Sequence, residues 1–134
     1  MILVDAGPLA ALVHKDDQHH ENCVAAFREL REPLGTVWPA LSEAMYVVGH
    51  LPQSQDALLT IFERGAVRLI PLNPADIPRI RELMHKYGDR PMDFADAALV
   101  TVAEREGIRT IFTVDRKDFS VYRLHGRGRF KIIP

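Results

Sequence analysis

The chain has 134 residues, of which 47% are hydrophobic and 26% charged, a length and composition typical of one soluble globular domain. Its net charge of −1 excludes a globally basic nucleic-acid-binding protein, and its single cysteine, Cys23, excludes an internal disulfide and fits a reducing cytoplasm. The N-terminal apolar run is too short to span a membrane and lacks the flanks of a signal peptide. We therefore expect one cytoplasmic domain over residues 1–134, with no membrane association.

Apolar runs and helical spacing predict strands and helices that alternate along the chain. Met1–Val4 is an apolar run that ends at Asp5, and Pro8 is well placed in the first turn of a following helix. The remaining predicted elements are helices 17–30, 39–48, 53–64, 73–87 and 93–106 and strands 34–37, 67–72, 110–114 and 130–133. Strands separated by helices predict an α/β fold with a central, mainly parallel β-sheet covered by helices on both faces.

Four isolated acidic residues lie beside apolar stretches that should be buried: Asp5, Glu43, Asp96 and Asp115. A buried carboxylate is costly unless a cation or a hydrogen-bond donor compensates it. Asp5 and Asp115 directly follow predicted strands, and the binding sites of parallel sheets lie beyond the carboxyl ends of the strands. The four acids therefore predict one acidic pocket that holds a divalent metal.

Glu43 and Asp96 come from predicted helices. At about 100° per residue, Asp96 shares a helix face with the apolar Leu99 and is expected on or near the inward face. Asp93 stands three residues before Asp96, where an N-cap belongs, so helix capping is its first interpretation and a metal or water-shell role its second. Asp118 is expected to form a turn or to cap a short helix.

The types of these residues indicate which metal and which chemistry to expect. Hard cations such as Mg²⁺ prefer carboxylate oxygens, so carboxylates without a His or Cys cluster fit Mg²⁺ or Mn²⁺ better than zinc. His19 and His20 are adjacent and diverge on a helix, and the other histidines have no ligand-like partners. Such metals also bind substrate phosphates and stabilise displacement at phosphorus, which indicates a phosphodiesterase. Ser42 lacks a G-x-S-x-G elbow, and no glycine-rich phosphate loop is present.

The C-terminal part of the chain is basic although the whole chain is not. Only Asp118 offsets its cations, which are Arg116, Lys117, Arg123, Arg127, Arg129 and Lys131. Such a segment either binds RNA phosphates, with Arg116, Lys117 and Arg123 as candidate contacts, or is an ordinary solvated surface. The composition supports both interpretations equally.

Four pieces of sequence, in this order, carry a family resemblance. They are Ile2-Leu-Val-Asp5-Ala-Gly-Pro-Leu9, Ser42-Glu43-Ala44, Pro91-Met-Asp-Phe-Ala-Asp96-Ala-Ala-Leu99 and Thr113-Val-Asp115-Arg-Lys-Asp-Phe119. Each piece is weak alone, but the ordered set in a chain of this length is fairly specific. The chain resembles a PIN-domain ribonuclease, and in particular a VapC-type toxin of a toxin–antitoxin pair.

The resemblance implies a three-layer α/β/α sandwich and Mg²⁺- or Mn²⁺-dependent cleavage of RNA. It implies that Asp5 and Asp96 are the core metal ligands and that Asp115 holds or orients a second metal or its water. Glu43 would complete the cage or position the attacking water. Thr113 stands where the family often has a hydroxyl near the site; it is either a hydrogen-bond donor to a carboxylate or an ordinary β-branched strand residue.

The resemblance also implies partners, and it has one departure. The family suggests a homodimer and a protein antitoxin that covers the site. The predicted middle helices have more apolar residues than one narrow stripe requires, and these fit a dimer face, an antitoxin groove or ordinary core packing. They are Val47, Val48, Leu58, Leu59, Ile61 and Phe62. The departure is Ala6, where the family commonly has Thr or Ser, so that one hydroxyl near the metal is missing.

Two other classes compete with a nuclease. A non-catalytic PIN-like module that binds RNA or protein remains the alternative, although it has no need to keep four costly carboxylates together. A phosphatase of the haloacid-dehalogenase type requires a second Asp two residues after Asp5, where this chain has Gly7. A receiver domain requires acidic neighbours before its Asp and a later strand Lys, and neither is evident.

Overall fold

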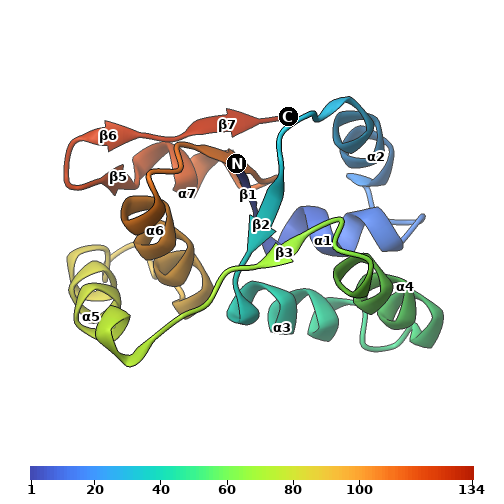
Figure 1. The fold of residues 1–134 in the computed structure, drawn as a ribbon, viewed down its shortest axis with the longest axis horizontal. Coiled ribbons are helices and arrows are strands. Elements are labelled where there is room, and N and C mark those ends of the chain that lie inside the picture. Colours follow the sequence, from blue (N-terminus) through green and yellow to red (C-terminus); the bar gives the residue numbers. More distant parts are fainter.

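The computed structural model describes residues 1–134 and contains a main sheet flanked by helices and a small two-stranded hairpin (Figure 1). The helices are α1 (Ala6–Val13), α2 (His20–Glu29), α3 (Trp38–Val47), α4 (Pro52–Glu63), the short 3₁₀ helix η1 (Pro74–Asp76), α5 (Ile77–Lys86), α6 (Phe94–Glu106) and α7 (Arg116–Val121). The strands are β1 (Ile2–Val4), β2 (Leu34–Thr36), β3 (Arg68–Leu69), β4 (Thr110–Phe112), β5 (Arg123–Leu124), β6 (Gly128–Arg129) and β7 (Lys131–Ile133).

The main sheet has five strands in the order β3-β2-β1-β4-β7, and every neighbouring pair is parallel. Val4 at the end of β1 lies beside Phe112 at the end of β4. The residues that follow these two strands, Asp5 and Thr113, therefore leave the same edge of the sheet side by side. The prediction of a parallel sheet is confirmed.

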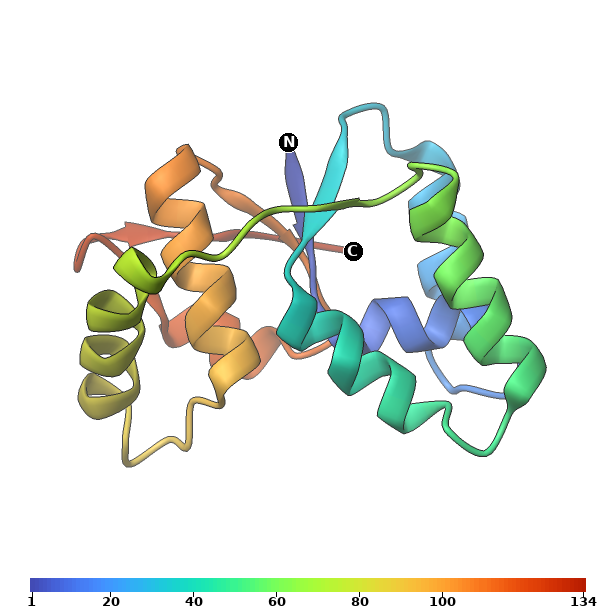
Figure 2. The ribbon, with the colours of Figure 1, turned by 60° about the horizontal axis from the view of Figure 1, so that its bottom comes forward.

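Helices cover both faces of the sheet (Figure 2), which confirms the α/β/α sandwich. Side chains of β1 alternate between the two faces, as a strand requires. Leu3 belongs to the core under α5 and α6, whereas Ile2 and Val4 belong to the core with α1 and α4. Because β1 is buried on both faces, its sequence Ile2-Leu-Val is an uninterrupted apolar run.

Helix α6 is buried along most of its length, from Ala95 to Ala103. Asp93 is its N-cap and accepts a hydrogen bond from the backbone N–H of Asp96 at 2.8 Å. Gly107 ends the helix in the left-handed conformation (φ 70°), which glycine adopts without the strain of a Cβ. A buried helix that begins beside the sheet edge places its first turn, and Asp96 with it, inside the protein.

The structure differs from the predicted elements at its periphery. Strand β3 has two residues rather than six: the N–H of Ile70 still reaches the carbonyl of Thr36 at 2.8 Å, but Pro71 has no N–H to continue the ladder. Residues 73–87 divide into η1 and α5. A short helix beside Asp118 was one of two expectations for that residue, and α7 is that helix, with Asp115 rather than Asp118 as its cap. The β5–β6 hairpin was not predicted; it turns through His125 and Gly126, both at positive φ.

None of the helices combines the length and the apolar character needed to cross a membrane.

Candidate functional site

Asp5 leaves the end of β1 and caps α1. One of its carboxylate oxygens, Oδ1, accepts the N–H of Ala6 at 2.8 Å, and Oδ2 accepts the hydroxyl of Thr113 at 2.8 Å. The side chain is buried. A Cβ at Gly7 would lie 2.7 Å from Cγ2 of Val114, so the first turn of α1 approaches the end of β4 this closely only with glycine. The local sequence Asp-Ala-Gly therefore brings the acid against the neighbouring strand.

Thr113 connects two of the predicted site residues. Its hydroxyl donates to Asp5 and accepts the backbone N–H of Asp115 at 3.0 Å. Asp115 in turn caps α7 by accepting the N–H of Asp118 at 3.2 Å. The cap of this short helix is thus Asp115, while Asp118 lies inside its first turn and pairs with Arg90 at 3.4 Å.

Asp96 is held by a residue that the sequence did not single out. The hydroxyl of Tyr122 donates to Oδ2 of Asp96 at 2.9 Å, and the ring of Tyr122 is fully buried between Tyr87 and Phe119. Tyr122 lies directly after α7, outside any periodic element, so no sequence pattern predicts this contact. Its position depends on the chain after α7 passing beside the first turn of α6.

Glu43 projects from α3 and is half-buried. Together with Asp93 it lines an open groove of about 680 Å³ between α3 and the start of α6. The other lining residues are Trp38, Pro39, Ser42, Tyr46, Phe94 and Ala95. The carboxylate of Glu43 therefore faces a surface that a ligand can reach.

The three less exposed acids have raised pKa values for two physical reasons. Burial, followed by the charges of Asp5 and Asp93, raises the pKa of Asp96 to about 8. Burial raises the pKa of Asp5 to about 6 against the hydrogen bonds from Thr113 and Ala6, which lower it. Burial and then the neighbouring Asp93 raise the pKa of Glu43 to about 7. None of these acids has a Lys or Arg in an ion pair, so the cluster has an excess of negative charge.

The acids repel one another, yet no three His, Cys, Asp or Glu side chains of the structure enclose a common ion position. The donor chemistry nevertheless fits a hard divalent cation: every candidate ligand is a carboxylate oxygen, and burial without a cation leaves them under-compensated. Mg²⁺ retains several waters and binds through one or two carboxylates. Carboxylates that do not enclose one position are therefore compatible with a Mg²⁺ ion that keeps part of its water shell.

Comparison with known proteins shows the family of this chain. The family model described as PIN domain matches residues 2–124. This chain belongs to the PIN-domain family. The match includes all four predicted acids, and it confirms the resemblance to PIN proteins drawn from the sequence.

Two proteins of Mycobacterium tuberculosis are similar to this PIN chain, one in sequence and one in structure. The chain is 41% identical to Ribonuclease VapC26 (strain ATCC 25618 / H37Rv) over 78 residues, which cover 58% of this chain and 58% of that protein. The crystal structure of VapC20, described as a Sarcin-Ricin loop cleaving toxin, superposes with a TM-score of 0.80 at 19% identity, over 87% of this chain and 92% of that one. The second comparison shows a shared fold.

The candidate RNA-binding cations of this PIN chain have different surroundings. The guanidinium of Arg123 donates hydrogen bonds to carbonyls at the end of α7. The acceptors are Ser120, Val121 and Tyr122, at 2.8, 2.8 and 3.2 Å. Arg116 donates to the carbonyl of Pro134. The side chain of Lys117 is exposed on α7 and makes no ion pair. Arg116 and Lys117 follow Asp115 directly, so they lie next to the carboxyl edge of the sheet.

Proposed function

We propose that this PIN-domain chain is a Mg²⁺- or Mn²⁺-dependent endoribonuclease of the VapC type, and that it acts in the cytoplasm as the toxin of a type II toxin–antitoxin pair. Its reaction is the hydrolysis of RNA phosphodiester bonds. Its partners are an RNA substrate, a cognate protein antitoxin and a second copy of the chain.

One observation carries the proposal: buried acids without cationic partners gather at the carboxyl edge of the sheet in a protein related to a ribonuclease. Asp5 and Asp96 each have hydrogen-bond donors but no Lys or Arg partner. Such carboxylates destabilise a fold unless they serve a ligand that supplies positive charge. The 41% identity to Ribonuclease VapC26 supports RNA as the substrate class.

We assign a role to each acid from its surroundings. Asp5 and Asp96 are the proposed core ligands, because they are the most buried and because the hydroxyls of Thr113 and Tyr122 fix their orientation. Hydrogen bonds of this kind position metal ligands and tune their basicity. Asp115 is exposed and suits a more hydrated position, at a second ion or its water.

Glu43 is the proposed acceptor for the attacking water. It reaches the groove from α3, and burial together with Asp93 places its pKa at about 7, which is where a general base works best near neutral pH. Asp93 caps α6, and we propose that it supports Glu43 and the metal-bound waters without binding the metal itself. The chemistry that bound Mg²⁺ or Mn²⁺ supplies is activation of water and neutralisation of charge on the scissile phosphate.

A cleavage assay with matched variants tests the proposal. Purified protein is incubated with a mixed RNA pool in Mn²⁺ and then in EDTA. We expect cleavage only with the metal, and a loss of about a hundredfold or more in Asp96→Asn, because that change removes a proposed core ligand without changing its size. The control is Asp89→Asn, which removes an exposed carboxylate of the loop after α5 and should leave the rate unchanged.

Cleavage that survives EDTA, or that is equal in Asp96→Asn and wild type, contradicts the proposed metal-dependent site. Absence of cleavage together with no effect of metal on the melting temperature favours the non-catalytic PIN-like module instead.

A further inference from the structure

The exposed aromatic side chains of this protein gather in one place. The exposed fractions are 61% for Trp38, 87% for Tyr46 and 52% for Phe94. Every other Tyr and Phe side chain of the protein is buried or half-buried. All three line the groove that contains Glu43 and Asp93. The exposed large aliphatic side chains, which include Leu59, Ile77 and Met84, lie outside this groove.

These three rings contribute little to the hydrophobic core. Helix α3 packs its Ala40, Leu41 and Ala44 into the core, and Trp38 and Tyr46 point away from that face. Phe94 follows the N-cap Asp93 and is exposed, while Ala95 beside it is buried. A group of exposed apolar side chains that contributes little to the core marks a binding surface.

The acids in the groove indicate what kind of ligand the rings bind. The groove is lined by Glu43 and Asp93 and by no Lys or Arg. An apolar protein surface seated there would bury both carboxylates without a cation, which is costly. A nucleic acid brings phosphates that divalent cations neutralise together with these carboxylates, and it presents the flat faces of its bases to aromatic rings.

We propose that Trp38, Tyr46 and Phe94 form a stacking platform for unpaired RNA bases that flank the scissile phosphate. The inference rests on the proposed function and names the form of its substrate. Trp38 and Tyr46 are eight residues apart on α3, or about 12 Å along the helix axis, and Glu43 lies between them in sequence. Phe94 borders the same groove from α6. Bases in a duplex have their faces covered by their neighbours, so the platform selects RNA that is locally single-stranded.

The chain offers a direct optical reporter, because Trp38 is its single tryptophan. A short unpaired RNA is titrated into the protein in Ca²⁺, and a gel verifies that the RNA stays intact. Base stacking on Trp38 should quench its fluorescence. The same RNA annealed to its complement, and a strand of the same length with abasic positions, should each bind roughly tenfold more weakly, since stacking contributes about that much per base.

Matched variants separate stacking from simple apolar contact. Tyr46→Phe keeps the ring and should bind as wild type, whereas Tyr46→Leu keeps an apolar side chain and should lose roughly tenfold in affinity. Leu59→Ala, at an exposed apolar position on α4 outside the groove, should have no effect. Circular dichroism verifies that each variant is folded.

Any one of several results would overturn the platform. One is that the protein binds the abasic strand as tightly as the intact RNA, and another is that Tyr46→Leu and Tyr46→Phe bind RNA with equal affinity. A further one is that the Trp38 fluorescence changes with protein concentration in the absence of RNA, and that this change is lost in Tyr46→Leu because the dimer dissociates. The last result would assign the rings to a contact between two copies. Metal-dependent cleavage without quenching overturns only the platform, whereas quenching without cleavage of any RNA keeps the platform and overturns the nuclease.

Discussion

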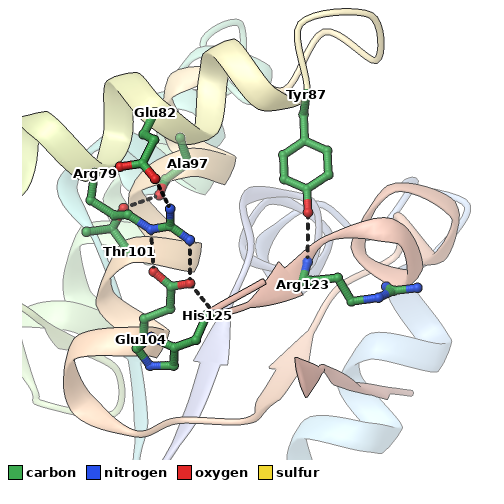
Figure 3. A network of polar contacts seen from close by, with 8 residues as sticks. All are labelled: Arg79, Glu82, Tyr87, Ala97, Thr101, Glu104, Arg123 and His125. Atoms are coloured by element: carbon green, nitrogen blue, oxygen red, sulfur yellow. Dashed lines mark hydrogen bonds and ion pairs between the residues drawn. The ribbon is translucent and has the colours of Figure 1, made fainter. Parts of the chain in front are cut away.

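The protein contains two groups of buried or half-buried acids: one group forms ion pairs with arginine, and the other has no cationic partner. Asp76 and Glu104 each bind an arginine: Arg105 pairs with Asp76 and donates to the carbonyl of Pro71, and Arg79 holds Glu104 through two bonds of 2.7 and 2.8 Å. Figure 3 shows Arg79 on Glu104, together with the backbone N–H of His125 on the same carboxylate. The pKa of Asp76 is lowered, mainly by the hydrogen bond from the backbone N–H of Asn73. Burial raises the pKa of Glu104, but the hydrogen bonds from Arg79 and from the backbone N–H of His125 outweigh it, so that this pKa is also lowered.

Asp5, Glu43 and Asp96 receive no arginine, and their pKa values are raised. The same chain therefore pairs its acids where they join helices and the hairpin, and leaves them without cations where the sheet edge opens to solvent. The first group therefore has its compensating charge within the fold, whereas the second has none and is where we propose that a divalent cation binds.

The largest expected effect is on the paired group. Glu104→Gln leaves Arg79 without its carboxylate and weakens the tie between α5, α6 and the β5–β6 hairpin. We expect the free energy of unfolding to fall by about 3 kcal/mol, as when one partner of a buried pair is removed. Urea denaturation measures this change. Asp96→Asn, in EDTA, should instead leave stability unchanged or raise it, because it removes repulsion.

If both variants lose stability equally, the distinction between the two groups of acids is wrong. Cleavage activity provides the opposite control, since Glu104→Gln should retain the activity of wild type at temperatures where it is folded.

The two groups should also respond to pH in different ranges. The unfolded carboxyls titrate near pH 4, below the folded pKa values of about 6, 7 and 8 for Asp5, Glu43 and Asp96. Between pH 4 and 8 the folded protein thus binds more protons than the unfolded chain, so its stability falls as pH rises. The lowered pKa values of Asp76 and Glu104 act in the opposite sense, and their stabilisation is lost only as pH falls below about 4.

Melting temperatures in EDTA from pH 5 to pH 8 test this expectation and should decrease. Saturating Mg²⁺ or Mn²⁺ should raise the melting temperature most at pH 8, because ligands bind metal when deprotonated. A melting temperature that rises with pH in EDTA would mean that the acids are compensated within the protein.

A smaller effect is expected from the hydroxyls that hold the acids. Tyr122→Phe removes the donor to Asp96, while Tyr87→Phe removes a neighbouring hydroxyl that accepts the backbone N–H of Arg123 at 3.0 Å (Figure 3) and does not touch the acids. We expect roughly tenfold weaker Mn²⁺ binding in Tyr122→Phe, as for other groups that orient metal ligands, and no change in Tyr87→Phe. Calorimetric titration with Mn²⁺ measures both, and equal affinities would reduce Tyr122 to a packing role.

The contrast between the two groups also shows what can be predicted from sequence. Two of the uncompensated acids were predictable, because Asp5 directly follows an apolar strand and Asp96 shares a helix face with apolar residues. The pairing of Arg79 with Glu104 was not, because it depends on how α5 packs against α6. The same holds for Tyr122, whose contact with Asp96 joins residues 26 positions apart across two helices.

The short elements were difficult for a related reason. The two-residue strands β3, β5 and β6 have too few residues for a period, and their limits are set by hydrogen bonds to distant partners. In the sequence Gly7 shows only that a second aspartate is absent, whereas the structure shows that its lack of a Cβ permits the approach to Val114.

The smallest expected effect concerns Lys117, a cation without a carboxylate partner. Lys117 lies two residues after Asp115 on the exposed side of α7 and forms no ion pair. If it contacts an RNA phosphate, Lys117→Glu should weaken RNA binding several-fold at low salt and reduce the slope of affinity against salt concentration by about 1. The matched control is Lys131→Glu, at the start of β7 and beside Thr110, on the opposite edge of the sheet from Asp5. If both changes weaken binding equally, the effect comes from net charge and not from a contact beside the acids.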